Sequence, residues 1–257
     1  MPEFFRTERD GRVLTVLFDR PEVRNAIHPP AARELERVFD EFEVDPELWV
    51  AILTGAGDQA FSAGNDLKYV ASGGEMSWPK TGFGGMTLRF DSVKPMIAAV
   101  NGVALGGGFE IALACDLIFA SEGASFGLPE PRVGQAALAG GIHRLVRQIG
   151  LKRAMGMLLT GRRVSAREGL ELGFVNEVVS PDQLLDAARR WADQILECAP
   201  LSVRGSKQAA MKGLDAPSLE EAVKGRYDQI LAMLRSSDYM EGARAFTEKR
   251  RPEWKGR

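Results

Sequence analysis

The sequence has few of the residues that build disulfide frameworks or metal clusters, with two cysteines and two histidines in 257 residues. Cys115 lies in an apolar run and Cys198 in a helical pattern, which indicates a reducing compartment and leaves room for one bridge at most. The spacing of histidine, cysteine and acidic residues resembles no metal site, and no G-x-G-x-x-G follows a predicted strand. We therefore expect neither a disulfide scaffold nor a bound metal.

An excess of one charge and long hydrophobic runs are also lacking. Lys and Arg number 33 against 35 Asp and Glu, for a formal net charge of −2, whereas a general nucleic-acid binder has a basic surplus. No apolar run approaches the roughly 18 residues that span a membrane, and the start MPEFFRTERDGR lacks the features of a secretory signal. We expect a cytoplasmic protein that binds neither nucleic acid nor membrane.

What is present is an alternation of strand and helix patterns. Residues 3–20 predict a hairpin that turns at Asp10 and Gly11. Residues 28–47 carry apolar side chains at helical spacing between prolines. Short apolar runs predict strands at 49–57, 96–100 and 117–121. This alternation predicts an α/β fold with largely buried sheets.

The pattern after residue 180 is helical. Ser218 with Glu221 fits a capping box, and Asp238 with Glu241 predicts the same device for the last helix. Apolar faces on these helices must pack on the same domain or on a neighbouring subunit. The sequence therefore predicts two parts, a catalytic domain over 1–180 and a helical region over 181–257.

Three glycines, Gly106–Gly108, precede the apolar run FEIALA, although glycine disfavours helices. An amide at a helix start has no partner within the helix and lies at the positive end of the dipole. A glycine there lets a ligand approach without meeting a Cβ, so the run fits either an oxyanion cradle or tight strand-to-helix packing. Asn65 in FSAGNDLK offers a second amide, or an ordinary Asx turn. Two convergent amides would form an oxyanion hole.

Two carboxylates stand close to these turns. A glutamate in the first turn of a helix, as at Glu110, is favoured by the helix dipole and is often exposed. Its neighbours Phe109 and Ile111 instead favour burial, and Glu130 lies between two prolines in a rigid segment. Carboxylates in apolar surroundings have raised pKa values and suit general acid–base catalysis near neutral pH.

The stretch IAAVNGVALGGGFEIALACDL resembles the signature of the crotonase superfamily, the enoyl-CoA hydratase/isomerase family. Further motifs occur in the family's order over nearly the whole chain: RPEVRNAI, FSAGNDLK, FGLPEPRVG, AGGIHRL, TGRRVSAREGLELGFVNEVV and FTEKRRPEWKGR. GLPE and the tail look most like the hydratase and carnitinyl-CoA dehydratase branch. The resemblance implies a spiral of ββα repeats, with C-terminal helices that form a homotrimer or a dimer of trimers.

The resemblance also implies an acyl-CoA thioester substrate, with CoA as part of the substrate and no permanently bound cofactor. The thioester oxygen would accept hydrogen bonds from the amides of Asn65 and Gly107. Glu110 would help activate water at Cβ, and Glu130 would exchange the proton at Cα. This pair favours an enoyl-CoA hydratase, a carbon–oxygen lyase. The alternatives are a specialised hydroxyacyl-CoA dehydratase, an isomerase, a thioester hydrolase or an acyl-CoA-binding protein without turnover.

Residues for the two ends of the substrate follow from the same resemblance. The CoA-binding positions would be Arg24, Ala63, Asp66, Leu67, Lys68 and Lys249. For the three basic residues, solvated surface charge is the alternative. The acyl pocket would include Trp78, Phe83 and Met86 from the long segment 71–90, and Leu138. Such a long loop is typically functional or disordered, and its aromatic residues could equally pack against the body of the domain.

Leu138 marks a departure from the family pattern. The usual I-P-G-A-G-G after the second glutamate is here AALAGG, with Ala137 in place of proline and Leu138 in place of glycine. Carnitinyl-type members typically have an acidic residue at the position of Leu138, as suits a quaternary ammonium group. Leu138 should instead intrude on the acyl pocket and favour an apolar or short substrate.

Overall fold

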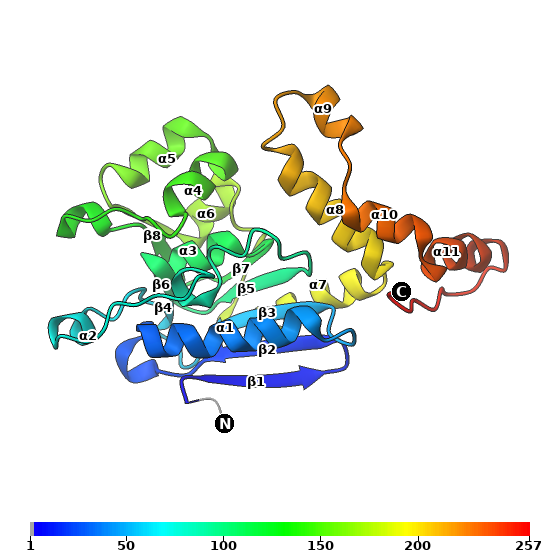
Figure 1. The fold of residues 1–257 in the computed structure, drawn as a ribbon. Coiled ribbons are helices and arrows are strands. Elements are labelled where there is room, and N and C mark those ends of the chain that lie inside the picture. Colours follow the sequence, from blue (N-terminus) through cyan, green and yellow to red (C-terminus); the bar gives the residue numbers. More distant parts are fainter. Residues whose placement is uncertain (1–2) are drawn as a thin grey trace.

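The computed structural model describes residues 3–257, whose strands form two sheets (Figure 1). The larger sheet has the strand order β1-β2-β3-β5-β7-β10, antiparallel between β1 and β2 and parallel elsewhere. Its strands are β1 (Phe5–Asp10), β2 (Val13–Phe18), β3 (Val50–Gly55), β5 (Met96–Val100), β7 (Leu117–Ser121) and β10 (Glu177–Val179). The predicted hairpin, the predicted strands and the α/β class are confirmed.

A smaller sheet has the order β4-β6-β8-β9, parallel except for the last pair. Its strands are β4 (Ala60–Ser62), β6 (Val103–Leu105), β8 (Ser125–Gly127) and β9 (Arg163–Ser165). β4, β6 and β8 each follow a strand of the larger sheet and precede a helix, which produces the spiral of ββα repeats. Three-residue strands are too short to show a hydrophobic period, so the sequence did not predict this sheet.

Helices follow the strand pairs and then form the C-terminal part of the chain. The helices are α1 (Pro29–Val44), α2 (Leu67–Ala71), α3 (Gly107–Ala114), α4 (Gly141–Ile149), α5 (Leu151–Leu158), α6 (Ala166–Leu172), α7 (Leu184–Leu196), α8 (Pro200–Gly213), α9 (Leu219–Lys224), α10 (Asp228–Arg235) and α11 (Ser237–Thr247). The 3₁₀ turns are η1 (Pro21–Val23), η2 (Phe83–Gly85), η3 (Glu130–Val133) and η4 (Pro181–Gln183). In residues 3–257, no helix combines the length and the apolarity needed to cross a membrane.

The larger sheet separates two hydrophobic cores. Alternate residues of β3 point to opposite faces, so Ala51 and Leu53 join the core that contains α1 and α3, while Ile52 joins the core beneath α7. α1 contributes a buried stripe that includes Leu35 and Phe39, as its helical period predicts. α3 differs from α1, because every residue from Gly107 to Leu113 is buried. The helix that carries Glu110 is therefore enclosed by the protein.

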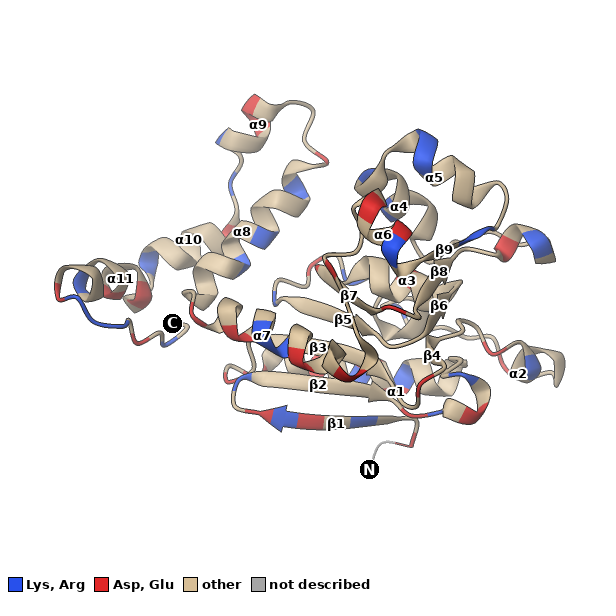
Figure 2. Ribbon diagram, turned by 180° about the vertical axis from the view of Figure 1, so that it is seen from behind, with Lys and Arg blue, Asp and Glu red and all other residues tan. Residues whose placement is uncertain are grey.

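The C-terminal helices α8–α11 lie to one side of this two-sheet body (Figure 1). α7, although it follows residue 180, packs on the outer face of the larger sheet. Large apolar side chains are exposed on the later helices: Leu214, Leu219, Val223, Met240 and Phe246. Charges of both signs are interspersed along the described chain, as on β1 (Figure 2).

Two of the predicted helix caps differ in outcome. Ser218 caps α9 by accepting a hydrogen bond from the Glu221 amide at 3.1 Å, as expected. The prediction that Asp238 caps the last helix is wrong, since Ser236 caps α11. The Asp238 carboxylate instead accepts hydrogen bonds from the backbone amides of Lys255 and Gly256, each at 2.8 Å. The C-terminal segment folds back on this carboxylate, and local sequence spacing does not encode that contact.

The buried stripe of α1 yields a stability prediction. Leu35 is 0% exposed and Val44, at the end of the same helix, is 80% exposed. Leu35→Ala should lower the free energy of unfolding by about 2–5 kcal/mol, because it leaves a cavity in the core. Val44→Ala should change it by no more than about 0.5 kcal/mol. Urea denaturation of both variants measures the difference, and equal losses would contradict the packing described.

Candidate active site

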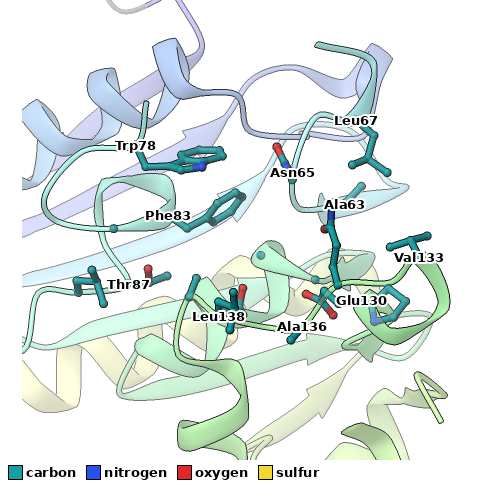
Figure 3. Close-up of a pocket in the computed structure, with 18 of the residues that line it drawn as sticks. Ala63, Asn65, Leu67, Trp78, Phe83, Thr87, Glu130, Val133, Ala136 and Leu138 are labelled. Carbon is teal, nitrogen blue, oxygen red and sulfur yellow. The ribbon is translucent and has the colours of Figure 1, made fainter. Parts of the chain in front are cut away.

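A cavity of about 560 Å³ lies where the turns before α2 and α3 meet the segments 78–88 and 129–139 (Figure 3). Its lining includes Asn65, Gly106, Gly107, Glu110 and Glu130. The structure thus brings both predicted acids and both predicted amide positions to one cavity. The remaining lining is largely apolar, with Trp78, Phe83, Leu88, Val133 and Leu138.

Close backbone packing holds the two turns together. Gly64 has φ 88°, and a Cβ added there would lie 2.5 Å from the Leu105 carbonyl oxygen and 2.9 Å from the Gly107 nitrogen. A Cβ on Gly108 would lie 2.2 Å from the Ser62 carbonyl oxygen. Such distances exclude any side chain, so the tight-packing interpretation of the glycines is correct. The same packing places the Asn65 turn directly against the start of α3.

The amides of Asn65 and Gly107 are left free by the hydrogen bonds of the fold. The Ile27 amide donates a hydrogen bond to the Gly64 carbonyl at 2.8 Å, and the Ile27 carbonyl accepts one from the Asp66 amide at 3.1 Å. The amide of Asn65, which lies between these two residues, takes no part in this pairing. Gly107 is the first residue of α3, where helix geometry offers no acceptor. Within residues 3–257, neither amide donates a hydrogen bond. Two donors are therefore available to a ligand at the positive end of the α3 dipole.

Glu110 is a buried carboxyl group at the cavity wall. Its side chain is 4% exposed, and its Oε1 accepts a hydrogen bond from the Gly141 amide at 2.8 Å. Burial raises the pKa of Glu110 to about 7, and the nearby Glu130 charge acts in the same direction. The Gly141 amide lowers this pKa but does not offset the burial. Glu110 can therefore exchange a proton near neutral pH.

Glu130 begins η3 and points into the cavity (Figure 3). A Cβ added to Gly106 would lie 3.2 Å from its Oε1, so this carboxylate lies against the glycine run. Its Oε2 is buried and has no hydrogen-bond partner among the described residues. Burial also raises the pKa of Glu130. A buried carboxylate oxygen without a hydrogen-bond partner lowers the stability of the fold. Such an oxygen needs an explanation, and contact with a bound substrate is one.

The predicted CoA positions divide into those at the cavity and those elsewhere. Ala63 and Leu67 line the cavity. Lys68 is exposed and follows Leu67 in the chain. Arg24 is also exposed, and its backbone carbonyl accepts a hydrogen bond from the Ala63 amide at 2.9 Å. Both cations thus stand beside residues of the lining.

Asp66 and Lys249 do not line the cavity. Asp66 is 6% exposed and its carboxylate forms an ion pair with Arg20 at 3.0 Å, so its side chain serves the fold. Lys249 follows α11, at the end of the molecule opposite α2 (Figure 1). Within one chain it is not brought to the site.

Of the predicted acyl-pocket residues, three line the cavity and one does not. The rings of Trp78 and Phe83 pack together with centroids 4.8 Å apart. Leu138 is 83% exposed and lines the cavity, as its departure from the family pattern predicts. The prediction that Met86 lines the acyl pocket is wrong. Met86 is 2% exposed and belongs to the hydrophobic core, because the segment around η2 packs against α1.

The sequence patterns did not predict Thr87, Arg132 and Gln135 in the lining, nor the hydrogen bonds that Gly141 and Arg144 donate. Gly141 and Arg144 belong to the family motif AGGIHRL, so the motif could have indicated that they lie near the site. Thr87 lies in the long loop beside residues that were predicted, but one threonine carries no pattern of its own.

The chain is similar to known proteins over nearly its whole length. The sequence model described as enoyl-CoA hydratase/isomerase matches residues 8–257. The carnitinyl-CoA dehydratase of Proteus mirabilis is 46% identical over 253 residues, 96% of each chain, and that of Salmonella arizonae is 45% identical over the full length of both. The crystal structure of enoyl-CoA hydratase from Mycobacterium tuberculosis H37Rv matches with a TM-score of 0.92 at 38% identity, over 100% of both chains.

The surroundings of Glu110 predict an unusual titration. Carbon NMR of glutamate-labelled protein should show one carboxyl with a pKa of about 7, and Glu110→Gln should remove that signal. Glu130→Gln should lower the pKa of Glu110, because a neighbouring negative charge is lost. Titration of every glutamate near 4.5, the ordinary value, would contradict the described burial.

Proposed function

Since the chain belongs to the enoyl-CoA hydratase/isomerase family, we propose that it adds water reversibly across the double bond of a 2-enoyl-CoA thioester. The observation that carries the proposal is the presence of two acids of raised pKa in one cavity with two free backbone amides. An isomerase or hydrolase does not need two acid–base groups beside one oxyanion site. A hydratase must move two protons, one from water and one to carbon.

The backbone amides act on the thioester oxygen. As water adds to Cβ, the electrons of the double bond move through Cα to that oxygen, which becomes an enolate. Hydrogen bonds from Asn65 and Gly107 stabilise the negative charge, and each such donor contributes roughly 2.7–4 kcal/mol to lowering the barrier. The tight glycine packing holds both donors in place before the substrate binds.

The two glutamates divide the proton transfers. Ionised Glu110 accepts a proton from water as the oxygen bonds to Cβ, and protonated Glu130 donates a proton to Cα. The net result moves one proton from Glu130 to Glu110, and the reverse reaction uses the opposite protonation. Raised pKa values allow the pair to hold one proton near pH 7.

A second candidate is the dehydration of carnitinyl-CoA, which is the activity named for relatives 43–46% identical to this chain. The Trp78–Phe83 ring pair favours it, because aromatic faces attract quaternary ammonium groups. Against it, Glu110 and Glu130 are the only carboxylates among the described lining residues, so none remains to pair with a cationic acyl end. The pocket therefore supports hydration of an uncharged enoyl chain better.

The assembly and the CoA contacts are part of the same proposal. The exposed apolar residues of the C-terminal helices, such as Leu219 and Phe246, support a homotrimer, alone or paired. Lys249 would then reach CoA bound to a neighbouring copy, whereas Arg24 and Lys68 stand near the cavity of their own chain.

The proposed acid–base roles predict the effect of removing each carboxylate. Glu110→Gln and Glu130→Gln should each lower kcat for crotonyl-CoA hydration by at least about a hundredfold. The measurement is the loss of the conjugated-thioester absorbance, with butyryl-CoA affinity as a control for an intact site. Activity on crotonobetainyl-CoA but not on crotonyl-CoA would favour the second candidate, and release of free CoA would identify a hydrolase.

The pKa of Glu110 predicts the pH dependence. Hydration needs ionised Glu110, whose pKa is about 7. Hydration also needs protonated Glu130, and without that negative charge the pKa of Glu110 is lower. The kcat/KM for hydration should therefore fall below the neutral range, where Glu110 becomes protonated, and again at alkaline pH, where Glu130 loses the proton that it donates to Cα. Initial rates between pH 5 and 9 test the prediction, and a profile that stays flat down to pH 5 would exclude Glu110 as the base.

A further inference from the structure

Thr87 places a hydroxyl group at the cavity that nothing in the described chain satisfies. The residue is 0% exposed and belongs to the lining. Its Oγ1 has no hydrogen-bond partner among residues 3–257. A buried hydroxyl without a partner costs folding free energy, and a valine of the same shape would avoid that cost. The hydroxyl is therefore a group whose partner is expected to come with a ligand.

The space beside this hydroxyl is kept open by Gly82. Gly82 has φ 89° and also lines the cavity. A Cβ at this position would lie 2.6 Å from the Thr87 Oγ1. A side chain at residue 82 would therefore fill the space next to the hydroxyl. With glycine at this position, that space remains part of the cavity.

The backbone of Thr87 is held from two sides. Its amide donates to the Phe83 carbonyl at 3.3 Å, and its carbonyl accepts from Arg144 Nη2 at 2.8 Å. The other terminal nitrogen of Arg144 donates to the Ala139 carbonyl at 3.4 Å. Arg144 thus joins the loop that carries Thr87 to the turn that precedes Gly141, the partner of Glu110. The hydroxyl has a defined position relative to the acids.

That position is at the acyl end of the cavity. Figure 3 shows Thr87 at one end, beyond Phe83 and Leu138, and Leu67 and Val133 at the other. Asn65 and Glu130 lie between these ends (Figure 3). A thioester held at Asn65 with its CoA toward Leu67 would extend its acyl chain toward Thr87. This orientation rests on the proposed function.

The chemistry around Thr87 defines what the chain end would carry. The lining residues beside Thr87, which are Gly82, Phe83 and Leu88, are uncharged. The Arg144 cation contacts the Thr87 carbonyl but does not belong to the lining. A hydroxyl both donates and accepts hydrogen bonds, whereas a trimethylammonium group can do neither with it. We propose that Thr87 selects acyl chains whose remote end carries an uncharged hydroxyl or carbonyl group. Leu138 and Phe83 would cover the carbon atoms between that group and the thioester.

Binding of saturated acyl-CoAs tests this selection without any need for turnover. Calorimetry would compare chains of four to six carbons with and without a terminal hydroxyl, on the full-length wild type, Thr87→Ser and Thr87→Val. The hydroxyl should strengthen binding by about tenfold in the wild type and in Thr87→Ser, and by no more than about twofold in Thr87→Val. Thr54→Val, at a buried threonine outside the cavity, is the matched control and should retain the tenfold preference.

Three outcomes would overturn the proposal: no preference for the hydroxyl in the wild type, an equal preference in Thr87→Val, or a stronger preference for a trimethylammonium end that Thr87→Val leaves unchanged. An unfolding midpoint of Thr87→Val no lower than that of the wild type would show that the fold is intact, because valine removes the cost of the unpartnered hydroxyl. Because saturated chains cannot be hydrated, failure of crotonyl-CoA hydration would overturn the proposed reaction and leave this binding result to stand or fall separately.

Discussion

The contact between the Gly64 turn and the start of α3 is the constraint on which the site depends. Gly64 approaches Gly107 so closely that no Cβ fits between them, and the hydrogen bonds of Ile27 secure the same turn from its other side. Two strand-to-helix turns, about 40 residues apart in the chain, therefore present together two amides that donate no hydrogen bond in the part of the chain that the structure describes. The glycines lower the intrinsic stability of the helix. The burial of every residue from Gly107 to Leu113 compensates for this loss.

Burial of α3 also sets the chemistry of Glu110. A carboxylate on an exposed helix would titrate near its ordinary value, but here the surrounding core raises its pKa to about 7. One backbone amide, from Gly141, partly compensates the buried oxygen. The fold therefore tolerates a destabilising acid, as is common where proton transfer is required. Glu130 carries a similar cost, since its Oε2 is buried and no residue from 3 to 257 offers it a hydrogen bond.

Arg144 connects the surroundings of Glu110 with the end of the cavity where Thr87 lies. Its guanidinium contacts the carbonyls of Ala139 and Thr87, which belong to segments that contribute Leu138 on one side and Phe83 on the other. The shape of this end of the cavity and the position of Glu110 are therefore linked through Arg144 and Gly141. A change in either loop would be expected to alter both the pocket shape and the hydrogen bond that Glu110 accepts.

The sequence by itself determined the hairpin, α1 and the buried strands, because their periods and turn residues act over short distances. Its motifs also predicted both glutamates, Asn65 and Gly107 as members of one site, and the structure places all four at one cavity. Tertiary structure decided what depends on remote neighbours: the small sheet, the ion pair of Asp66, the burial of Met86 in the core, and the burial of the Thr87 hydroxyl in the cavity wall without a partner among residues 3–257. Side-chain direction and the choice of hydrogen-bond partner are settled by elements far apart in the chain, and no local pattern records them.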